Sequence, residues 1–360
     1  MTTNLQDNGF AIAVQKYFPG LHGARRKFLE LVIPGMVKAS SVTLSKIACA
    51  IGGSSQIDSI VRRLQRFLAV NPLDQQRVAF FIINMLGICG AMDIAIDRTN
   101  WKLGKVPINI LMLSVRWKSK AVPLFWILLD KEGNSSQNER IDLLQLFLDT
   151  FSADLINSLT ADREFIGRDW FEWLLNKEIP FYIRIKSNTE VARRGKTKAA
   201  KDLFKAVKPG RIRRKRGIFT VFGCDVHLSG GPAKDKKGED DFFIIASSLD
   251  GPDAAKTYAL RWRIEQLFKE LKSSGFQLEE THLTKPDRLS ALLALLAIAF
   301  CWILKVGQDQ AEKEPRLVRK CKHGRPRRSI TRIGFDTIRK AFWSHEKRDI
   351  NTLLNFVSCT

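Results

Sequence analysis

The chain has 360 residues and carries 59 Lys and Arg against 37 Asp and Glu, which gives a formal net charge of +22. Hydrophobic residues make up 45% and charged residues 27%, a balance that excludes a disordered polycation and is typical of a folded protein with two or three structural regions. A chain of this length can bury its core without disulfides or structural metals. The positive charge predicts a polyanionic partner, either nucleic acid or a membrane surface.

Cysteine spacing and hydropathy narrow these alternatives. The six cysteines are scattered, and no pair has the CxxC spacing of a zinc ribbon or a redox motif. The pattern predicts mostly buried, reduced thiols, as in a cytoplasmic protein. The longest uncharged run, residues 289–304, is shorter than a membrane span. We therefore expect a buried core helix there and no membrane partner.

Residues 1–90 are predicted to form a helical region. Two segments of helical periodicity, Val42–Ile51 and Gln56–Leu68, are separated by residues 52–55, which have the sequence Gly-Gly-Ser-Ser. This arrangement is typical of a helix-turn-helix, and the second segment carries Arg62, Arg63 and Arg66. An ordinary helical hairpin explains the pattern equally well.

The pattern changes from residue 91 onward. Three strand-like runs, Met92–Ile96, Ile108–Trp117 and Val122–Leu129, are separated by turns at 104–105 and 118–120. They are followed by predicted elements in this order: the helix Arg140–Phe151, a short strand that ends at Asp162, the helix Gly167–Asn176 and the strand Ile179–Ile185. Three strands and then helix–strand–helix–strand is the order of a ribonuclease H-like core.

A basic, β-rich segment interrupts this order. Strand-like runs at 217–222 and 241–247 accompany a basic stretch from Arg193 to Arg216, and helical structure resumes at Pro252. We expect an α/β fold, with a ribonuclease H-like mixed sheet flanked by helices, a β-strand insertion and an N-terminal helical DNA-binding region. The expected regions are 1–90 (helical, DNA-binding), 91–185 (first part of the core), 186–250 (basic insertion), 251–310 (rest of the core) and 311–360 (basic C-terminal region).

Charge is distributed unevenly over these regions. Residues 91–180 carry 11 basic and 13 acidic groups, whereas the flanking blocks are basic, with 10 and 4 in 1–90, 17 and 8 in 181–250, and 21 and 12 in 251–360. A near-neutral block between basic ones suits a catalytic centre that holds carboxylates while its surroundings bind phosphates.

Three carboxylates stand out by context. Asp97 follows the apolar run 94–96, and Asp162 ends a second strand. A carboxylate at the end of a buried strand is costly unless a cation or hydrogen bonds compensate it. If residues 254–273 form one helix, its polar groups fall in a sector of about 60° at the margin of an apolar stripe; these groups are Tyr258, Arg261, Glu265 and Lys272. A solvated face with a Glu–Arg pair explains this helix as well.

Carboxylates without His or Cys at metal-binding spacing match hard, oxygen-ligated cations. The expected cofactor is Mg²⁺, with Mn²⁺ as a substitute. Two such ions about 3.5–4 Å apart can activate a water or a 3′-hydroxyl and stabilise the leaving oxygen of a phosphodiester displacement. The five His form no HExxH or HxH spacing, and the sequence has no GxxxxGK[ST] loop or GxSxG elbow.

The same residues carry a family resemblance. Tyr258-x2-Arg261-x3-Glu265-x6-Lys272 is similar, at full spacing, to the Y-R-E-K signature of bacterial insertion-sequence transposases of the DDE superfamily, insertion sequence four type. Asp97-Arg98-Thr99 and Asp162-Arg163-Glu164-Phe165 resemble the first and second aspartate motifs of that family. The resemblance extends from roughly residue 90 to residue 340 and implies a ribonuclease H-like fold with an insertion between Asp162 and Glu265.

The resemblance also implies roles for these residues. Asp97, Asp162 and Glu265 would hold two Mg²⁺ ions, while Tyr258, Arg261 and Lys272 would hold phosphates and Trp262 would contact displaced DNA. The implied reaction is cut-and-paste transposition: water nicks the transposon end, the freed 3′-hydroxyl forms a hairpin, water reopens it, and the 3′-hydroxyl attacks target DNA. The implied partner is double-stranded DNA, both terminal inverted repeats and target, bound by a homodimer at the bacterial nucleoid.

The insertion departs from relatives in one respect. They use a tryptophan of this segment to stack on a flipped base, and this chain has no Trp between 174 and 261. A phenylalanine would have to stack on the base instead, and the candidates are Phe219, Phe222, Phe242 and Phe243. For each of these residues, a place in the hydrophobic core is the more common role. Within the basic stretch, Arg213, Arg214, Lys215 and Arg216 are expected to contact phosphates without reading bases.

Two other functions stay open on the sequence. One is a DNA-binding repressor without catalysis, descended from a transposase, whose binding would be indifferent to Mg²⁺. The other is a ribonuclease H-like nuclease of the host, which needs no binding to specific DNA ends. The intact set of three carboxylates argues against the first, and footprinting on inverted repeats would separate the second from a transposase.

Overall fold

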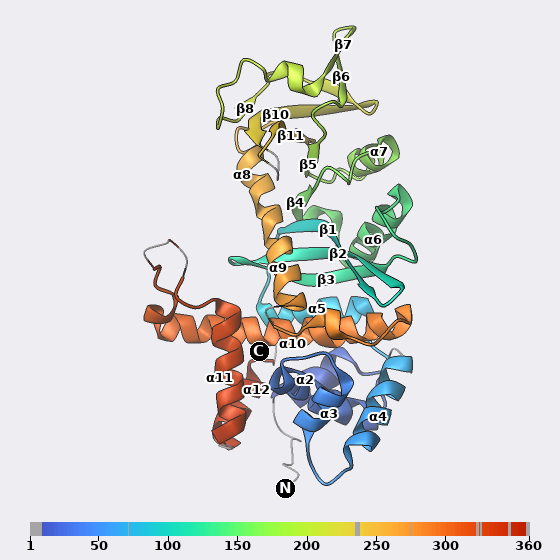
Figure 1. Ribbon diagram of the computed structural model, residues 1–360, viewed down its shortest axis with the longest axis vertical. Coiled ribbons are helices and arrows are strands. Elements are labelled where there is room, and N and C mark those ends of the chain that lie inside the picture. The colour runs from blue at the N-terminus through green and yellow to red at the C-terminus, as the bar shows by residue number, and fades with distance from the viewer. Residues whose placement is uncertain are drawn as a thin grey trace. The chain divides into compact units, whose positions relative to one another are not determined.

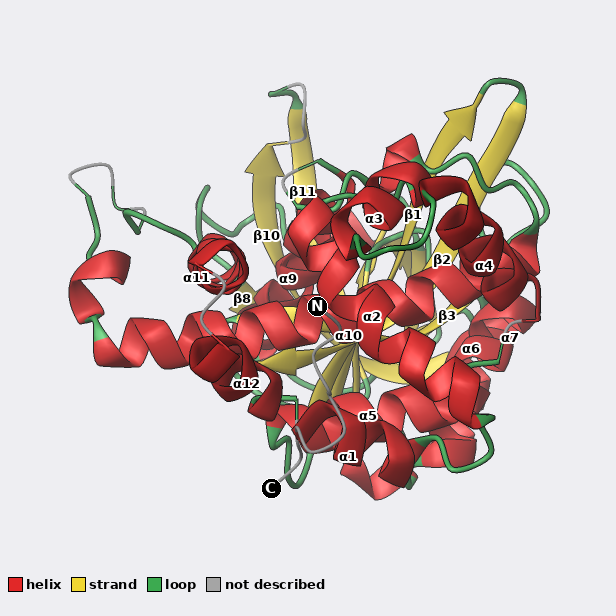
Figure 2. Ribbon diagram, turned by 90° about the horizontal axis from the view of Figure 1, so that it is seen from below, coloured by secondary structure: helices red, strands yellow, loops and turns green. Residues whose placement is uncertain are grey.

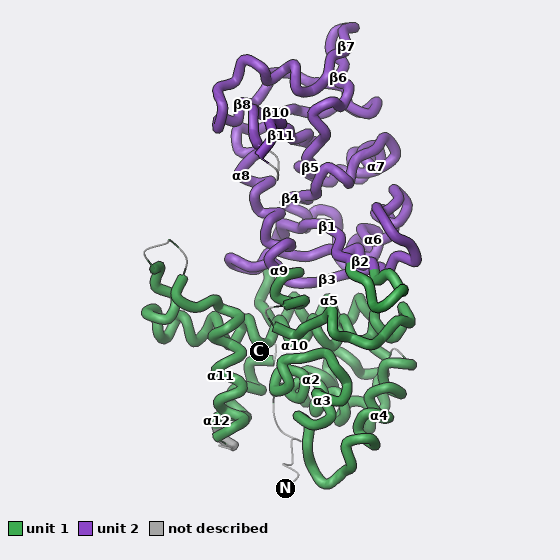
Figure 3. Tube along the Cα trace, in the orientation of Figure 1, with its two compact units in different colours: residues 1–89, 101–108, 267–360 green, residues 90–100, 109–266 purple. Residues whose placement is uncertain are grey.

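The computed structural model describes residues 9–70, 72–234, 238–273, 275–321, 324, 326–344 and 347–357. The chain divides into two compact units, coloured separately in Figure 3. Unit 1 consists of residues 1–89, 101–108 and 267–360, and unit 2 consists of residues 90–100 and 109–266. The chain crosses between the units more than once, so neither is a continuous segment.

The core of unit 2 is a mixed sheet in the strand order β3-β2-β1-β4-β5 (Figure 1). β2 pairs with β3 antiparallel, whereas β4 pairs parallel with both β1 and β5. The strands are β1 (Met92–Leu103), β2 (Val106–Trp117), β3 (Lys120–Leu128), β4 (Ile156–Ala161) and β5 (Phe181–Ile185). All were expected from the sequence, in this order, so the predicted α/β class and ribonuclease H-like sheet are confirmed.

A tight turn joins the first two strands, and the second strand is buried on both faces. β1 and β2 are joined by Gly104 and Lys105, and Gly104 has φ +59°, the left-handed conformation that two-residue hairpin turns require. Residues 108–115 of β2 are buried without alternation, as in a strand covered on both faces. The sheet therefore needs helices on each side.

Helices supply this cover. α6 (Gln137–Thr150) begins with a capping box in which Ser136 and Glu139 bond each other's backbone, the arrangement that satisfies the free N–H groups of a first turn. α6 packs against β3 and against α7 (Arg168–Asn176), while α8 (Ala254–Tyr258) packs against β4 and β5. Figure 1 shows α6 and α7 on one side of the strands and α8 with α9 (Trp262–Lys272) on the other.

The insertion continues the same sheet. β11 (Asp240–Ser247) pairs antiparallel with β5, β10 (Cys224–Lys234) follows it, and the path ends in β9 (Phe219–Val221), β6 (Glu190–Arg193) and β7 (Lys196–Ala199). The short β8 (Arg213–Arg214) pairs with β10 off this path. Including these strands, the sheet has 11 strands among the described residues. The eleven-residue strand β10 was not foreseen from the sequence.

One expected element is interrupted. The continuous helix expected over 254–273 is instead α8, a 3₁₀ turn at Ala259–Arg261 and then α9. The tighter turn changes the angular positions that a uniform 100° step assigns. Tyr258 and Arg261 are consequently buried, 2% and 4% exposed, and do not lie at the margin of the helix contact.

Apart from the hairpin tip of β1 and β2 at residues 101–108, unit 1 is mainly helical over its described residues. Its helices are α1 (Gly9–Tyr17), α2 (Gly23–Ala39), α3 (Leu44–Ile51), α4 (Ile57–Val70), α5 (Gln75–Leu86), α10 (Pro286–Lys313), α11 (Ile330–Ser344) and α12 (Lys347–Asn355). α10 contacts α2, α4, α5 and α11, and Figure 2 shows the helices of this unit as coiled ribbons from below. The helix therefore forms the centre of the unit.

α10 has the length and hydropathy of a membrane span. α2 and α3 reach that length and hydropathy only together, as a pair of helices bent by 107°. In α10, 89% of the apolar window is buried within the protein, which is typical of a core helix and confirms the buried helix expected over 289–304. α10 and α11 cross closely at Gly334, which has no side chain. A Cβ built on this glycine would lie 2.0 Å from the carbonyl oxygen of Ile303.

Candidate active site

Asp97 and Asp162 lie where the parallel pairing of β1 with β4 ends, although β1 itself continues to Leu103 and Asp97 does not end the strand as expected. In the parallel pairing of β1 with β4, Ile96 is opposite Ala161. Asp97 directly follows Ile96, and Asp162 directly follows Ala161. Because neighbouring strands lie about 4.8 Å apart, the register brings the two carboxylates together. Strand pairing therefore places these acids, which are 65 positions apart in the sequence.

Asp97 is held in a strongly perturbed environment. Its side chain is 15% exposed, and burial raises its pKa from 3.8 to about 6, while the Arg261 guanidinium and the backbone N–H of Arg98 oppose this rise. Asp162 and Glu164 raise the pKa further through repulsion. A buried carboxylate with neighbouring acids is the arrangement that a bound cation would stabilise.

Arg261 is the centre of the hydrogen-bond network. It donates from Nη1 to Oδ2 of Asp97 at 3.0 Å and from Nη2 to Oε1 of Glu265 at 2.7 Å. Its Nε donates to the hydroxyl of Tyr258 at 3.0 Å. Burial opposes ionisation of Arg261, yet its pKa is raised, because Tyr258, Asp97 and Asp162 favour the cation. The structure thus joins Asp97, Tyr258, Arg261 and Glu265 in one connected group.

Glu265 is the least confined member of this group. Its side chain is 52% exposed and pairs with Arg261. Within the described part of the chain, no three His, Cys, Asp or Glu side chains gather as a ready metal site, since the guanidinium lies between Asp97 and Glu265. The available donors are the carboxylate oxygens of three acids, and burial raises the pKa of one of them, Asp97. Oxygen donors of this kind fit a hard divalent cation. Asp97, Asp162 and Glu265 would hold it.

Other nearby acids are engaged elsewhere. Asp93 accepts hydrogen bonds from Asn157 and Ser158, both at 2.7 Å, and pairs with Arg116 at 3.0 Å. Its carboxylate is therefore fully used in holding β1 to its neighbours. Glu279 pairs with Lys272 and Glu280 pairs with Lys46. Asp93, Glu279 and Glu280 are thus engaged in contacts outside the network of Arg261.

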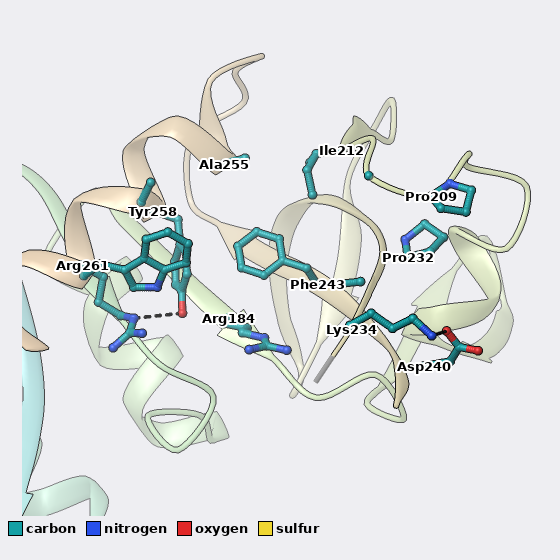
Figure 4. A pocket seen from close by; sticks show the side chains of 14 residues that line it. Arg184, Pro209, Ile212, Pro232, Lys234, Asp240, Phe243, Ala255, Tyr258 and Arg261 are labelled. Carbon is teal, nitrogen blue, oxygen red and sulfur yellow. Dashed lines mark hydrogen bonds and ion pairs between the residues drawn. The ribbon is translucent and has the colours of Figure 1, made fainter. Parts of the chain in front are cut away.

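A cavity of about 870 Å³ opens beside Tyr258 and Arg261 within unit 2. Tyr258 and Arg261 lie on one side, and Phe243 and Ile212 lie across from them (Figure 4); Trp262 also lines the cavity. Trp262 is 58% exposed, and the ring of Phe243 meets that of Tyr258 edge-on at 5.2 Å. The cavity combines aromatic walls with the guanidinium groups of Arg184 and Arg261, a set of groups that suits a nucleotide.

The remaining predicted contacts lie outside this network. Lys272 ends α9, belongs to unit 1, pairs with Glu279 at 2.7 Å and lies over the ring of Trp101 at 5.1 Å. In the basic stretch, Arg213 and Arg216 are exposed, Arg214 pairs with Asp250 at 2.6 Å, and Lys215 lies over the ring of Phe204. Of these four residues, Arg213 and Arg216 have the side chains most accessible to a DNA phosphate.

The structure also reveals supporting residues to which the sequence assigned no role. Arg98, adjacent to Asp97, pairs with Glu164 at 3.3 Å and donates to Asn109 at 3.1 Å. Asn109 in turn donates to the carbonyls of Lys131 and Gly133. These bonds connect the residues that follow both aspartates. The signal was present in the Asp-Arg-Thr and Asp-Arg-Glu motifs, in which Arg98 directly follows Asp97 and Glu164 is the second residue after Asp162.

The sheet order, together with an acidic pair where the parallel pairing of β1 with β4 ends and an arginine-linked glutamate, defines the class of this protein as an α/β fold of the ribonuclease H type. The sequence pattern of the transposase DDE domain family matches residues 92–302, which is more than half of the chain and includes the site. The protein therefore belongs to the transposase DDE domain family. Among curated proteins, none matches the chain. Membership in this family implies a transposition enzyme.

Proposed function

We propose that this protein is the transposase of a bacterial insertion sequence of the insertion sequence four type, acting as a homodimer on terminal inverted repeats in the cytoplasm, at the nucleoid. It cleaves phosphodiester bonds and joins the freed 3′ end to target DNA. The observation that carries the proposal is the register that sets Asp97 beside Asp162, with Arg261 joining Asp97 to Glu265.

The acidic and the cationic residues of the site have different proposed roles. Asp97, Asp162 and Glu265 are the proposed ligands of two Mg²⁺ ions, which when bound supply activation of the attacking oxygen and stabilisation of the leaving one. Arg261 and Tyr258 bind the phosphate beside the cleaved bond, because an arginine fork suits two phosphate oxygens. Lys272, at the end of α9, and the basic residues 213–216 hold more distant phosphates.

We further propose that cleavage passes through a hairpin. The cavity beside Trp262 supports this step, because formation of a tight hairpin extrudes a base that needs an aromatic surface. Of the four phenylalanines considered from the sequence, Phe243 lines this cavity. Phe219 and Phe222 pack elsewhere, the former under Arg193 and the latter against Phe171. Phe243 is therefore the proposed stacking residue.

Strand cleavage in Mg²⁺ tests the proposal. The substrate is a supercoiled plasmid that carries the gene with its native flanking DNA. We expect Asp97→Asn, Asp162→Asn and Glu265→Gln each to reduce cleavage to the level seen without enzyme or with EDTA. Asp93→Asn is the matched control, since Asp93 lies on the same strand with all its contacts structural, and it retains cleavage. Intact cleavage in all three variants refutes the proposed ligands.

The rival functions predict different results. A DNA-binding repressor binds the terminal repeats equally well with and without Mg²⁺ and cleaves nothing. A ribonuclease H-like nuclease cleaves without protecting inverted repeats in a footprint. Replacing Arg213, Arg214, Lys215 and Arg216 by Ala weakens DNA binding and flattens its dependence on salt, if these residues contact phosphates. An unchanged salt dependence contradicts that assignment.

A further inference from the structure

Helix α4 of unit 1 has two chemically different faces. One face is buried in the unit and consists of Ile60, Leu64, Phe67 and Leu68. The opposite face is exposed and carries Arg62 and Arg66, which are four residues apart and therefore neighbours on the helix surface. Two like charges at this spacing destabilise a helix, so the folding of α4 does not explain them.

A polar cleft of about 570 Å³ opens on this exposed face. Its lining comes from two helices and consists of Ser59, Arg62, Gln65, Arg66 and Ala69 of α4 together with Arg288 of the first turn of α10. All of its charged lining residues are arginines. Three guanidinium groups converging from two elements create a concentrated positive charge, which an anion bound in the cleft would neutralise.

The third arginine of α4 has a different role. Arg63 stacks on the ring of Phe28 at 4.2 Å and donates to the carbonyl oxygen of Ala24. Burial lowers the pKa of Arg63, and repulsion from Arg66 lowers it further. Arg63 is thus a packing residue that joins α4 to α2, whereas Arg62 and Arg66 line the cleft.

We infer that this cleft binds the sugar–phosphate backbone of duplex DNA, as a contact surface of unit 1 in addition to the carboxylate site and to residues 213–216. The inference rests on the proposed function, from which DNA is the polyanion that the protein handles. Arg62 and Arg66 are about 6 Å apart along the helix axis, which lets each guanidinium reach a different phosphate of one strand. Ser59 and Gln65 add neutral donors, which commonly accompany arginine at phosphates.

Salt-dependent DNA binding tests the inference. The experiment uses the full chain with Asp97→Asn to prevent cleavage, and the probe is a fluorescent random-sequence duplex. We expect Arg62→Ala/Arg66→Ala to reduce the slope of log affinity against log salt concentration by about 2, or about 0.9 for each lost phosphate contact. Arg288→Ala, from the other helix, reduces the slope by about 1. Arg62→Lys/Arg66→Lys keeps the charge and retains most of the slope.

Arg77→Ala is the matched control, because Arg77 is an exposed arginine of α5 in the same unit and does not line the cleft. Since alanine favours the helix more than arginine, the variants fold, and circular dichroism checks this. If the Arg62/Arg66 variant has the slope of the Arg77 variant, the inference is overturned while the proposed function stands. A loss of single-strand binding alone also overturns it. If the parent binds no duplex, the proposed function itself fails.

Discussion

Arg261 donates to Oδ2 of Asp97 at 3.0 Å, across 164 positions of sequence. The two side chains are 5% and 15% exposed, so the ion pair lies in a weakly screened environment, where each charge depends on the other. The same guanidinium bonds Glu265. One cation therefore fixes the acid of β1 and the acid of α9 with respect to each other.

Loss of Arg261 is expected to destabilise the protein severely. Arg261→Ala leaves Asp97 as a buried charge without its cation, a change that costs about 3–5 kcal/mol of unfolding free energy. Denaturant unfolding in EDTA measures the loss. Lys269→Ala, an exposed position of α9, serves as the control and changes stability by about 0.5 kcal/mol or less. Equal midpoints for the two variants would show that the pair contributes nothing.

Asp97 gives the protein a defined dependence on pH. Because burial raises its pKa from 3.8 to about 6, the native state retains a proton that the unfolded chain has released between these values. The contribution of Asp97 to stability is thus fully present below about pH 4 and is lost as the pH rises through about 6, a change on the order of 3 kcal/mol. Asp97→Asn lacks this titration. The difference in unfolding free energy between parent and variant, measured in EDTA from pH 4 to 7, should show the change, and a flat difference would contradict it.

The helix crossing in unit 1 depends on a glycine. Gly334→Ala places a methyl group 2.0 Å from the carbonyl oxygen of Ile303, so α10 and α11 must separate. We expect a loss of about 1–3 kcal/mol, despite the better helix propensity of alanine, and a lower melting temperature. Gly23→Ala is the control, since its added Cβ meets nothing within 4 Å. An unchanged melting temperature for Gly334→Ala would mean that the two helices can move apart freely.

The Arg98–Glu164 pair is expected to affect cleavage without binding substrate. Glu164→Gln weakens the ion pair that joins the residues following both aspartates. Outer partners of metal ligands typically contribute 10- to 100-fold to activity, so cleavage should fall by about that factor. Glu172→Gln removes an exposed pair with Arg168 and should have no such effect. Titration with Mg²⁺ adds a second measure, because Glu164→Gln should require more of the ion for half-maximal cleavage.

Local patterns were sufficient to predict the first part of the sheet and its acids. The apolar runs that end near Asp97 and Asp162 have the length and composition of buried strands, and the structure pairs them side by side. The interruption at Ala259–Arg261 could not be predicted, because it depends on Arg261 finding three partners, one of them on β1. Likewise, β10 contains two glycines and a proline, which disfavour strand prediction, and its pairing with β11 comes from tertiary structure.

The pairing of β11 with β5 has a consequence for shortening the chain. β11 belongs to the inserted segment, yet it is hydrogen-bonded along the outer side of β5. Excision of all residues between β5 and α8 would leave β5 with unpaired backbone groups, a template for aggregation. A minimal version of this enzyme must therefore retain β11 as a protecting strand, so the insertion cannot be treated as a removable accessory.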